Sequence, residues 1–241
     1  MNKNSNTYQI IYAAVLVLIV GTLLALIYMA LKPQQDINKA NDKRKQILSA
    51  VHITPTGDNS VEDTFNKYIV AGYLVNNEGE VIDSTANVAF DVNMKNNIKE
   101  DARKLPVFKC RLDDGSTKYV IPVYGAGLWG PIWGYIAIDN NGIDVYGAFF
   151  SHESETPGLG AEIGNENFQS QFQGKKIYVD GEFKSLGVMK AGQTPTDGAD
   201  YVNAITGGTI TSRGVQKMLK DCMTPYEPFF KKLQTNNVSP K

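Results

Sequence analysis

The feature that most restricts how this chain can fold is an uncharged apolar run near its N-terminus. The stretch from Ile10 to Leu31 contains no charged residue, and as an α-helix it would be about 33 Å long at roughly 1.5 Å per residue. That length crosses the hydrocarbon core of a bilayer. A cleaved signal peptide is the alternative, but this run exceeds the usual apolar region of a signal and no clean cleavage site follows it. The sequence therefore predicts a short tail over residues 1–9 and a transmembrane helix over residues 10–31.

The rest of the chain is long enough for one globular domain and a short connection to the anchor. With 241 residues, of which 42% are hydrophobic, the length suffices for one anchor and one sizeable core, but not for several domains. Residues 32–53 are charged, and Ile37, Ile47 and Leu48 within them are spaced as one stripe of a helix. We expect this juxtamembrane segment to be helical and to pack on the domain or a neighbour, and the domain to span residues 54–241.

Strand and turn signals dominate that domain. Runs of β-branched and aromatic residues predict strands over residues 68–75, 118–123, 135–138 and 145–150. Turn sequences that end in glycine at residues 77–79, 113–115 and 140–142 separate strands as in hairpins. A helical pattern follows between Arg213 and Leu233. The predicted fold class is α+β with a mainly antiparallel sheet.

Several function classes lack support in the sequence. The net charge is −1 and no basic cluster alternates with aromatic residues, so we expect no nucleic-acid partner. No glycine-rich nucleotide motif follows a strand. Two isolated cysteines, Cys110 and Cys222, and two histidines are too few for a zinc site or iron–sulfur cluster, so no metal is expected. The cysteines could form a disulfide or remain buried free thiols, and a redox cofactor would be organic or supplied by a partner.

Hydroxyls and glycines gather at residues 206–212, in the sequence Thr-Gly-Gly-Thr-Ile-Thr-Ser, just before the predicted C-terminal helix. Thr211 or Ser212 is the expected N-cap of that helix. Gly207 and Gly208 permit close approach of the backbone, and the free N–H groups of a first helical turn favour an anion in front of them. The run therefore predicts a phosphate held beside Thr209, and the alternative is an ordinary capped helix after a glycine turn.

Two further motifs contain candidate ligand contacts. Residues 124–135 hold both tryptophans among glycines and a proline, which predicts a rigid loop whose rings, Trp129 among them, could pack on a flat ligand or simply on the protein. Residues 152–160 place polar groups before a Pro-Gly turn. His152 and Glu155 could form a general acid–base pair, but we favour a structural role for both.

The hydroxyl-rich run resembles the Ser/Thr-Gly-Ala-Thr-x-Thr signature of proteins that carry FMN on threonine through a phosphodiester bond. By this resemblance Thr209 is the acceptor. The chain departs from the signature at Asn203, where an acidic residue is usual, and at Gly208, where alanine is usual. Behind one N-terminal anchor the three motifs follow in the chain order 124–135, 152–160 and 206–212. Together they resemble the family of the C subunit of the Na+-translocating NADH:quinone oxidoreductase. The Tyr-Gly-x-Gly-Leu-Trp-Gly-Pro-Ile-Trp-Gly-Tyr loop distinguishes that family from the related G subunit of Rnf complexes.

The resemblance implies an electron relay. Electrons from NADH would enter another subunit, pass iron–sulfur centres, reach one covalent FMN on this chain, and continue to FMN on a neighbouring membrane subunit and to quinone. The chain would be one subunit of an NADH:ubiquinone reductase, incomplete as an enzyme alone, with no catalytic side chain of its own. Its partners would be the other subunits and a flavin transferase. The implied FMN contacts are Thr206, Gly207, Gly208, Thr209, Thr211, Trp129, Thr156 and Leu159.

The charge pattern and the family resemblance place the domain on opposite sides of the membrane. Lys3 alone precedes the apolar run, whereas Lys32, Lys39, Lys43, Arg44 and Lys45 follow it, so the positive-inside rule places the domain in the cytoplasm. The resemblance implies a single-pass protein of the bacterial inner membrane with an extracytoplasmic, periplasmic FMN-binding domain, and we adopt that expectation. The alternatives are an Rnf-type G subunit, another membrane-anchored flavin carrier, and a membrane-anchored scaffold domain without redox function.

Overall fold

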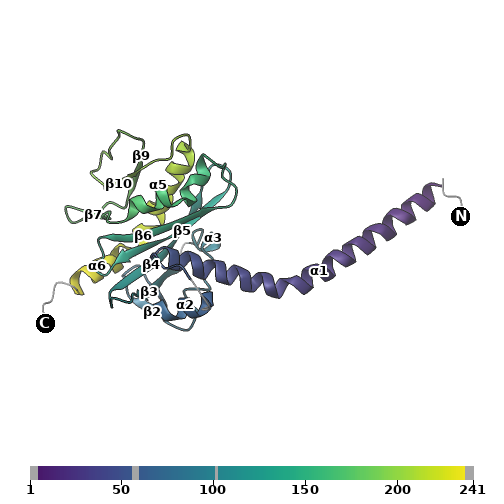
Figure 1. Cartoon of the computed structure of the whole chain (residues 1–241), viewed down its shortest axis with the longest axis horizontal. Coiled ribbons are helices and arrows are strands. Elements are labelled where there is room, and N and C mark those ends of the chain that lie inside the picture. The colour runs from purple at the N-terminus through teal and green to yellow at the C-terminus, as the bar shows by residue number, and fades with distance from the viewer. Residues whose placement is uncertain (1–4, 56–59, 101–102, 237–241) are drawn as a thin grey trace. The chain divides into compact units, whose positions relative to one another are not determined.

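The structure is a computed structural model that describes residues 5–55, 60–100 and 103–236 (Figure 1). The chain divides into two compact units, Met1–Lys43 and Arg44–Lys241. The division falls inside the first helix, so the last turns of that helix belong to the second unit.

Helix α1 (Asn6–Ser49) is continuous through the predicted membrane helix and most of the predicted juxtamembrane segment. It is long and apolar enough to cross a membrane, by length and composition, and its apolar run from Ile10 to Leu31 is exposed. Beyond that run, only part of the apolar stripe predicted for residues 32–53 packs against the domain. Ile37 is exposed, whereas Ile47 and Leu48 are fully buried in the domain.

A six-stranded antiparallel sheet forms the centre of the second unit, in the spatial order β2-β1-β3-β4-β5-β6. This confirms the predicted α+β class with a mainly antiparallel sheet. Four of its strands lie where the sequence predicts strands, whereas β2 and β3 were not predicted. The strands are β1 (Ile69–Val75), β2 (Val81–Asp83), β3 (Leu105–Arg111), β4 (Thr117–Ala126), β5 (Pro131–Asp139) and β6 (Val145–His152).

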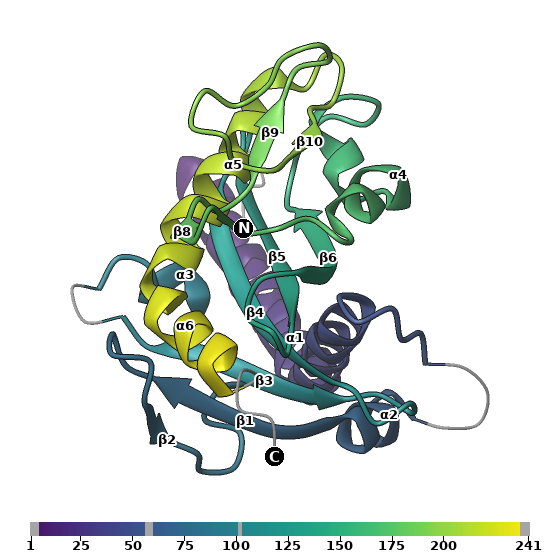
Figure 2. The ribbon, with the colours of Figure 1, turned by 90° about the vertical axis from the view of Figure 1, so that its left-hand side faces the viewer.

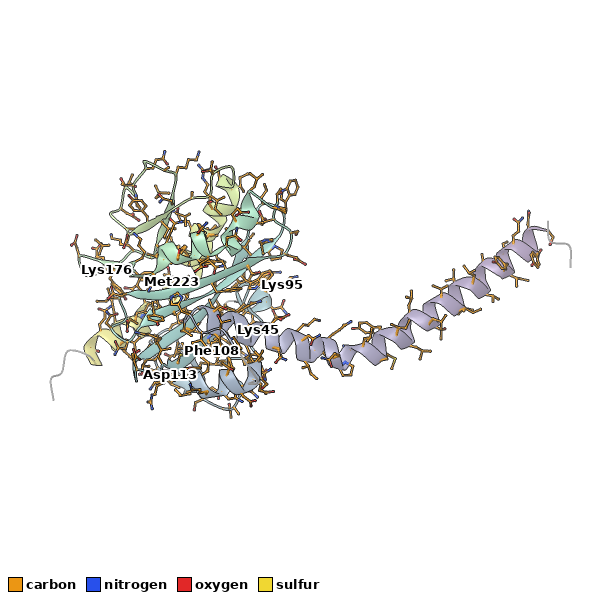
Figure 3. The ribbon with its side chains drawn as sticks, in the orientation of Figure 1. Lys45, Lys95, Phe108, Asp113, Lys176 and Met223 are labelled. Atoms are coloured by element: carbon orange, nitrogen blue, oxygen red, sulfur yellow. The ribbon has the colours of Figure 1, made fainter. Side chains whose placement is uncertain are left out.

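Both faces of the sheet are covered, which is why its central strands are buried along most of their length. Successive residues of β5 point to opposite faces: Ile136 belongs to one core, and its neighbours Tyr135 and Ala137 belong to the other. The first core packs against α5 (Thr209–Met223), the 3-10 turn η3 (Thr224–Tyr226) and α6 (Glu227–Asn236), which lie across the sheet (Figure 2). The second packs against the end of α1 and α2 (Val61–Tyr68). Figure 3 labels one buried residue from each core, Met223 and Phe108.

Short elements complete the domain around α5. The two-residue strands β7 (Tyr178–Val179) and β8 (Glu182–Phe183) pair with each other, and β9 (Gly187–Met189) pairs in parallel with β10 (Tyr201–Asn203). The Val188 N–H donates to Gln216 Oε1 at 3.1 Å, which fixes β9 beside α5 (Figure 2). The others are α3 (Met94–Asn97), η1 (Gly160–Gly164), α4 (Glu166–Gln169) and η2 (Ser170–Phe172).

The prediction of a long rigid loop over residues 124–135 is wrong. These residues form the end of β4, the start of β5 and a turn of only residues 127–130, in which the Gly127 N–H donates to the Gly130 carbonyl at 2.8 Å. Glycine does not break the strand here because it serves packing: a Cβ on Gly125 would lie 2.8 Å from Met218 Cβ on α5. The turn therefore projects Trp129 alone, while Trp133 stays within the sheet.

Candidate functional site

A cleft of about 400 Å³ opens where three segments meet: the β4–β5 turn, residues 155–160, and the start of α5. Every site residue predicted from the sequence lines this cleft except Thr206, which is exposed just before it. Four lining residues were not predicted, although each lies within or beside a predicted motif: Leu128, Glu155, Gly160 and Ile210.

The N-terminus of α5 supplies one end of the cleft. The helix begins at Thr209 with Gly208 as its N-cap, and no side chain caps it; the expectation that Thr211 or Ser212 would be the N-cap is wrong. Those two hydroxyls are buried and bond to residues outside the helix: Ser212 Oγ accepts from the Ile205 N–H at 3.1 Å, and Thr211 Oγ1 donates to Glu155. The first turn of α5 thus has no side-chain cap and lines the cleft, and an uncapped helix N-terminus attracts an anion.

Gly207 brings the preceding turn against the opposite wall. Its φ is +78°, a conformation in which L-residues are strained, and a Cβ there would lie 2.6 Å from Leu159 Cδ2. A glycine is therefore needed for the turn to reach the start of α5 while Leu159 keeps its place in the cleft wall.

Glu155 holds the three segments together. Its side chain is buried, Oε1 accepts from the Trp129 backbone N–H at 2.8 Å, and Oε2 accepts from Thr211 Oγ1 at 2.5 Å. His152 accepts the Glu155 backbone N–H at its Nδ1 at 3.2 Å. The structural role that we favour for both residues stays a prediction, and these contacts, to the backbone and to Thr211, are compatible with it. No spacing in the sequence signals the bond between Glu155 and Thr211.

Large apolar side chains surround the cleft and remain open to solvent. The exposed fractions are 66% for Trp129, 55% for Ile210, 46% for Leu128 and 42% for Leu159. The second tryptophan has another role, because the Trp133 indole N–H donates to Gln46 Oε1 at 3.0 Å. An apolar-walled cleft that ends at an uncapped helix N-terminus fits a ligand with a flat ring and a phosphate.

The two cysteines of the chain lie outside the cleft. Cys110 and Cys222 are free, buried, and on opposite faces of the sheet, so the disulfide alternative does not hold in this structure. Burial raises the pKa of the Cys110 thiol to about 12 and also raises the pKa of Cys222. Among the described residues, no group of three His, Cys, Asp or Glu side chains could hold a metal ion.

Comparison with known proteins identifies the family. The FMN-binding domain family matches residues 127–224, which contain the whole cleft. The C subunit of the Na(+)-translocating NADH-quinone reductase from Haemophilus ducreyi is 31% identical over 236 residues, covering 91% of this chain and 90% of that protein. The chain belongs to the family of C subunits of Na(+)-translocating NADH-quinone reductases. The resemblance based on the three motifs is thereby confirmed.

Other members of this family support the same assignment. The C subunit from Pasteurella multocida is 32% identical over 254 residues, covering 97% of this chain and 96% of that protein. The crystal structure of the Parabacteroides distasonis C subunit has 41% sequence identity and a TM-score of 0.76, covering 88% of this chain and 98% of that one. The crystal structure of Shewanella oneidensis NqrC has 27% sequence identity and a TM-score of 0.68, covering 83% of this chain and 99% of that one. The chain is thus one component of an oxidoreductase complex and contains an FMN-binding domain.

Proposed function

We propose that this protein is an electron relay that carries one FMN, joined through its phosphate to Thr209. The observation that carries the proposal is the position of Thr209: it is the first residue of the uncapped helix α5, and it also lines the apolar cleft. A phosphate on its hydroxyl lies in the field of the helix N-terminus while the attached ring can reach the cleft. When bound, FMN supplies the capacity to accept and donate electrons.

The phosphate end of the site depends on backbone groups. A phosphodiester keeps one negative charge, which the positive end of the helix dipole and the free N–H groups of the first turn stabilise. Gly207 and Gly208 leave room for the phosphate because they lack side chains. Thr206 lies outside the cleft lining and would act through the turn alone.

The ring end of the site depends on side chains. Trp129, Leu159 and Ile210 offer apolar surface to a flat ring and exclude water from it. The Thr156 hydroxyl lies in the same wall and can exchange a hydrogen bond with a polar edge of the ring. Thr211 is bound to Glu155, so it positions the wall and leaves hydrogen bonding with the ring to Thr156.

The chain needs no catalytic base for this function. An electron carrier moves no proton to or from a substrate carbon, and no described side chain is hydrogen-bonded to the Thr209 hydroxyl to activate it. Attachment therefore requires an external flavin transferase. Electrons would arrive from iron–sulfur centres in a partner subunit and leave to the next flavin on the way to quinone, the order that the family resemblance implies.

We further propose that residues 10–31 anchor the chain in the bacterial inner membrane, that residues 32–53 form the connection, and that residues 54–241 form the FMN-binding domain on the periplasmic side. The exposure and composition of the apolar run support the anchor. No carboxylate lies between Ile10 and Leu31, so this helix offers no ligand of its own for sodium. Sodium translocation then belongs to partner subunits.

The test is the intact mass of the chain purified from its native host. The wild-type chain should carry an added mass equal to FMN less water and show flavin fluorescence in a denaturing gel. Thr209→Ala should lose both, whereas the matched variant Thr206→Ala should keep both. Native chain without added mass would refute the relay and favour the scaffold alternative. Added mass that survives in Thr209→Ala would move the attachment to another hydroxyl.

A further inference from the structure

Thr209 also lines a second cleft, of about 620 Å³, which extends along α5 from Thr209 to Asp221. The outer face of α5 forms one wall and the region after β9 forms the other, and Figure 2 shows β9 beside α5. The first cleft is mainly apolar, whereas cations line the second. The attachment residue thus stands on the boundary between two surfaces of different chemistry.

Four cationic side chains line the second cleft: Lys190, Arg213, Lys217 and Lys220. The only carboxylate in the lining is Asp221, which pairs with Lys217 at 2.6 Å. No described carboxylate forms an ion pair with the other three cations. The whole chain has a net charge of −1, so this excess of positive charge is a local property of the face.

The excess of positive charge continues on the neighbouring surface of α5. A third cleft, of about 500 Å³, shares Lys217 and Asp221 with the second and adds Lys95, Lys99 and Arg103. Lys95 and Lys99 have no ion-pair partner among the described residues, and Figure 3 labels Lys95 at the surface. Arg103 donates to the Asp221 carbonyl oxygen at 3.0 Å, which holds its guanidinium beside α5. We call the exposed side of α5 with its two flanking clefts the cationic face.

The cationic face adjoins the exposed apolar side chains around the FMN-binding cleft. Ile210 follows Thr209 on α5 and is 55% exposed, and Trp129 on the neighbouring turn is 66% exposed. Exposed aromatic and aliphatic groups bordered by charges are the usual composition of a protein–protein interface, in which a tryptophan is a frequent energetic centre. Charge of one sign on such a border selects a partner of the opposite sign.

We propose that the cationic face is the docking surface for an acidic surface of a partner subunit, the one that exchanges electrons with the flavin. This inference rests on the proposed function, because it assumes a flavin at Thr209. A protein partner fits better than a lipid surface, since the cation-lined second cleft is concave and of about 620 Å³, and protruding acidic side chains can enter it. Docking here would bring the partner within a short distance of the attached ring.

The first experiment is zero-length crosslinking of the intact complex with a carbodiimide, which joins lysine amines to carboxylates in contact. We expect crosslinks from Lys190, Lys217 or Lys220 to Asp or Glu residues of another subunit. Lys231 and Lys232 on α6 are the control lysines, and we expect none from them to another subunit. Crosslinks from α6 alone, or from neither set, would overturn the proposal.

The second experiment reverses charge. Lys217→Glu with Lys220→Glu is compared with Lys231→Glu with Lys232→Glu, since Lys217 and Lys231 are both exposed and both belong to i,i+4 ion pairs. Each complex is purified in neutral detergent through a tag on another subunit, and the retained chain is measured against salt concentration. We expect the α5 variant to be retained about tenfold less at moderate salt, with the control unchanged.

The readouts separate this proposal from others. The mass of covalent FMN is measured on each variant chain, so failure of attachment at Thr209 is seen independently of docking. Normal retention with reduced FMN mass would assign the face to the modifying enzyme and overturn the proposal. A defect seen only in native membranes would assign it to anionic lipid headgroups, and equal loss in the control would show a non-specific effect; both results would also overturn it.

Discussion

Glu155 Oε2 accepts a hydrogen bond from Thr211 Oγ1 at 2.5 Å, across 56 positions of the chain. The same carboxylate accepts the Trp129 backbone N–H. One buried side chain thus fixes the relative positions of the turn that bears Trp129, the segment that bears Leu159, and the helix that begins at Thr209. The geometry of the cleft between these three segments depends on it.

Glu155→Ala should destabilise the domain because it leaves the buried Thr211 hydroxyl and the part-buried Trp129 backbone N–H without their acceptor. We expect a loss of about 2–4 kcal/mol in the free energy of unfolding, and about 1 kcal/mol for Glu155→Gln, which keeps an acceptor in place. Urea unfolding of the detergent-solubilised chain, followed by tryptophan fluorescence, measures both losses. If the two variants were equally stable, the carboxylate would not be the group that joins the segments.

Gly207→Ala should affect the cleft more than it affects stability. The positive φ costs about 1 kcal/mol for any L-residue, and the new Cβ would meet Leu159 Cδ2, the mobile end of a side chain that can shift within the cleft wall. Gly198→Ala is the matched control, because Gly198 has φ +74° with no atom within 4 Å of a Cβ. Both variants should unfold at similar urea concentrations, but only Gly207→Ala should lower the yield of covalent FMN by mass. Equal yields would show that Leu159 does not need its present position.

The domain should lose stability at alkaline pH. Burial raises the pKa of Cys110 from 9.0 to about 12 and raises the pKa of Tyr73, Tyr135 and Tyr226 above the ordinary value of 10.0. Above about pH 9 the unfolded chain therefore releases protons that the folded chain retains, so the unfolded state binds fewer protons and the free energy of unfolding falls as pH rises. Urea midpoints measured from about pH 8 to about pH 11 should decline, with tyrosinate absorbance appearing together with unfolding. Ionisation of these tyrosines without unfolding would contradict the assigned burial.

Local patterns in the sequence predicted much of the fold. The apolar run from Ile10 to Leu31 needs only its length and lack of charge to be seen, and α1 contains it whole. The strand pattern at residues 145–150 and the helical pattern after Arg213 are also local, because periodicity reports which face of an element is buried. β3 was missed although its burial is nearly continuous, since a short apolar run with Pro106 and two basic residues has no clear period.

Local patterns predicted the wrong structure where packing overrides them. Four glycines between Tyr124 and Tyr135 suggested a loop, but at Gly125 the missing Cβ makes room for Met218 of α5. The hydroxyls of Thr211 and Ser212 suggested an N-cap, but both are turned toward partners elsewhere in the chain, Glu155 and Ile205. In each case the residue type is correct for its position, and the neighbour that explains it is distant in sequence.

The sequence by itself determined the long apolar helix near the N-terminus, the fold class and the hydroxyl-rich run with Thr209, because each is a property of consecutive residues. Only the tertiary structure decided that Trp129 faces the cleft while Trp133 bonds to Gln46, that Glu155 joins three segments, and that Lys190 and Lys220 belong to one cationic face. The physical reason is that side-chain hydrogen bonds and clefts form between segments that the sheet and α5 bring together, and neither spacing nor composition encodes which segments meet.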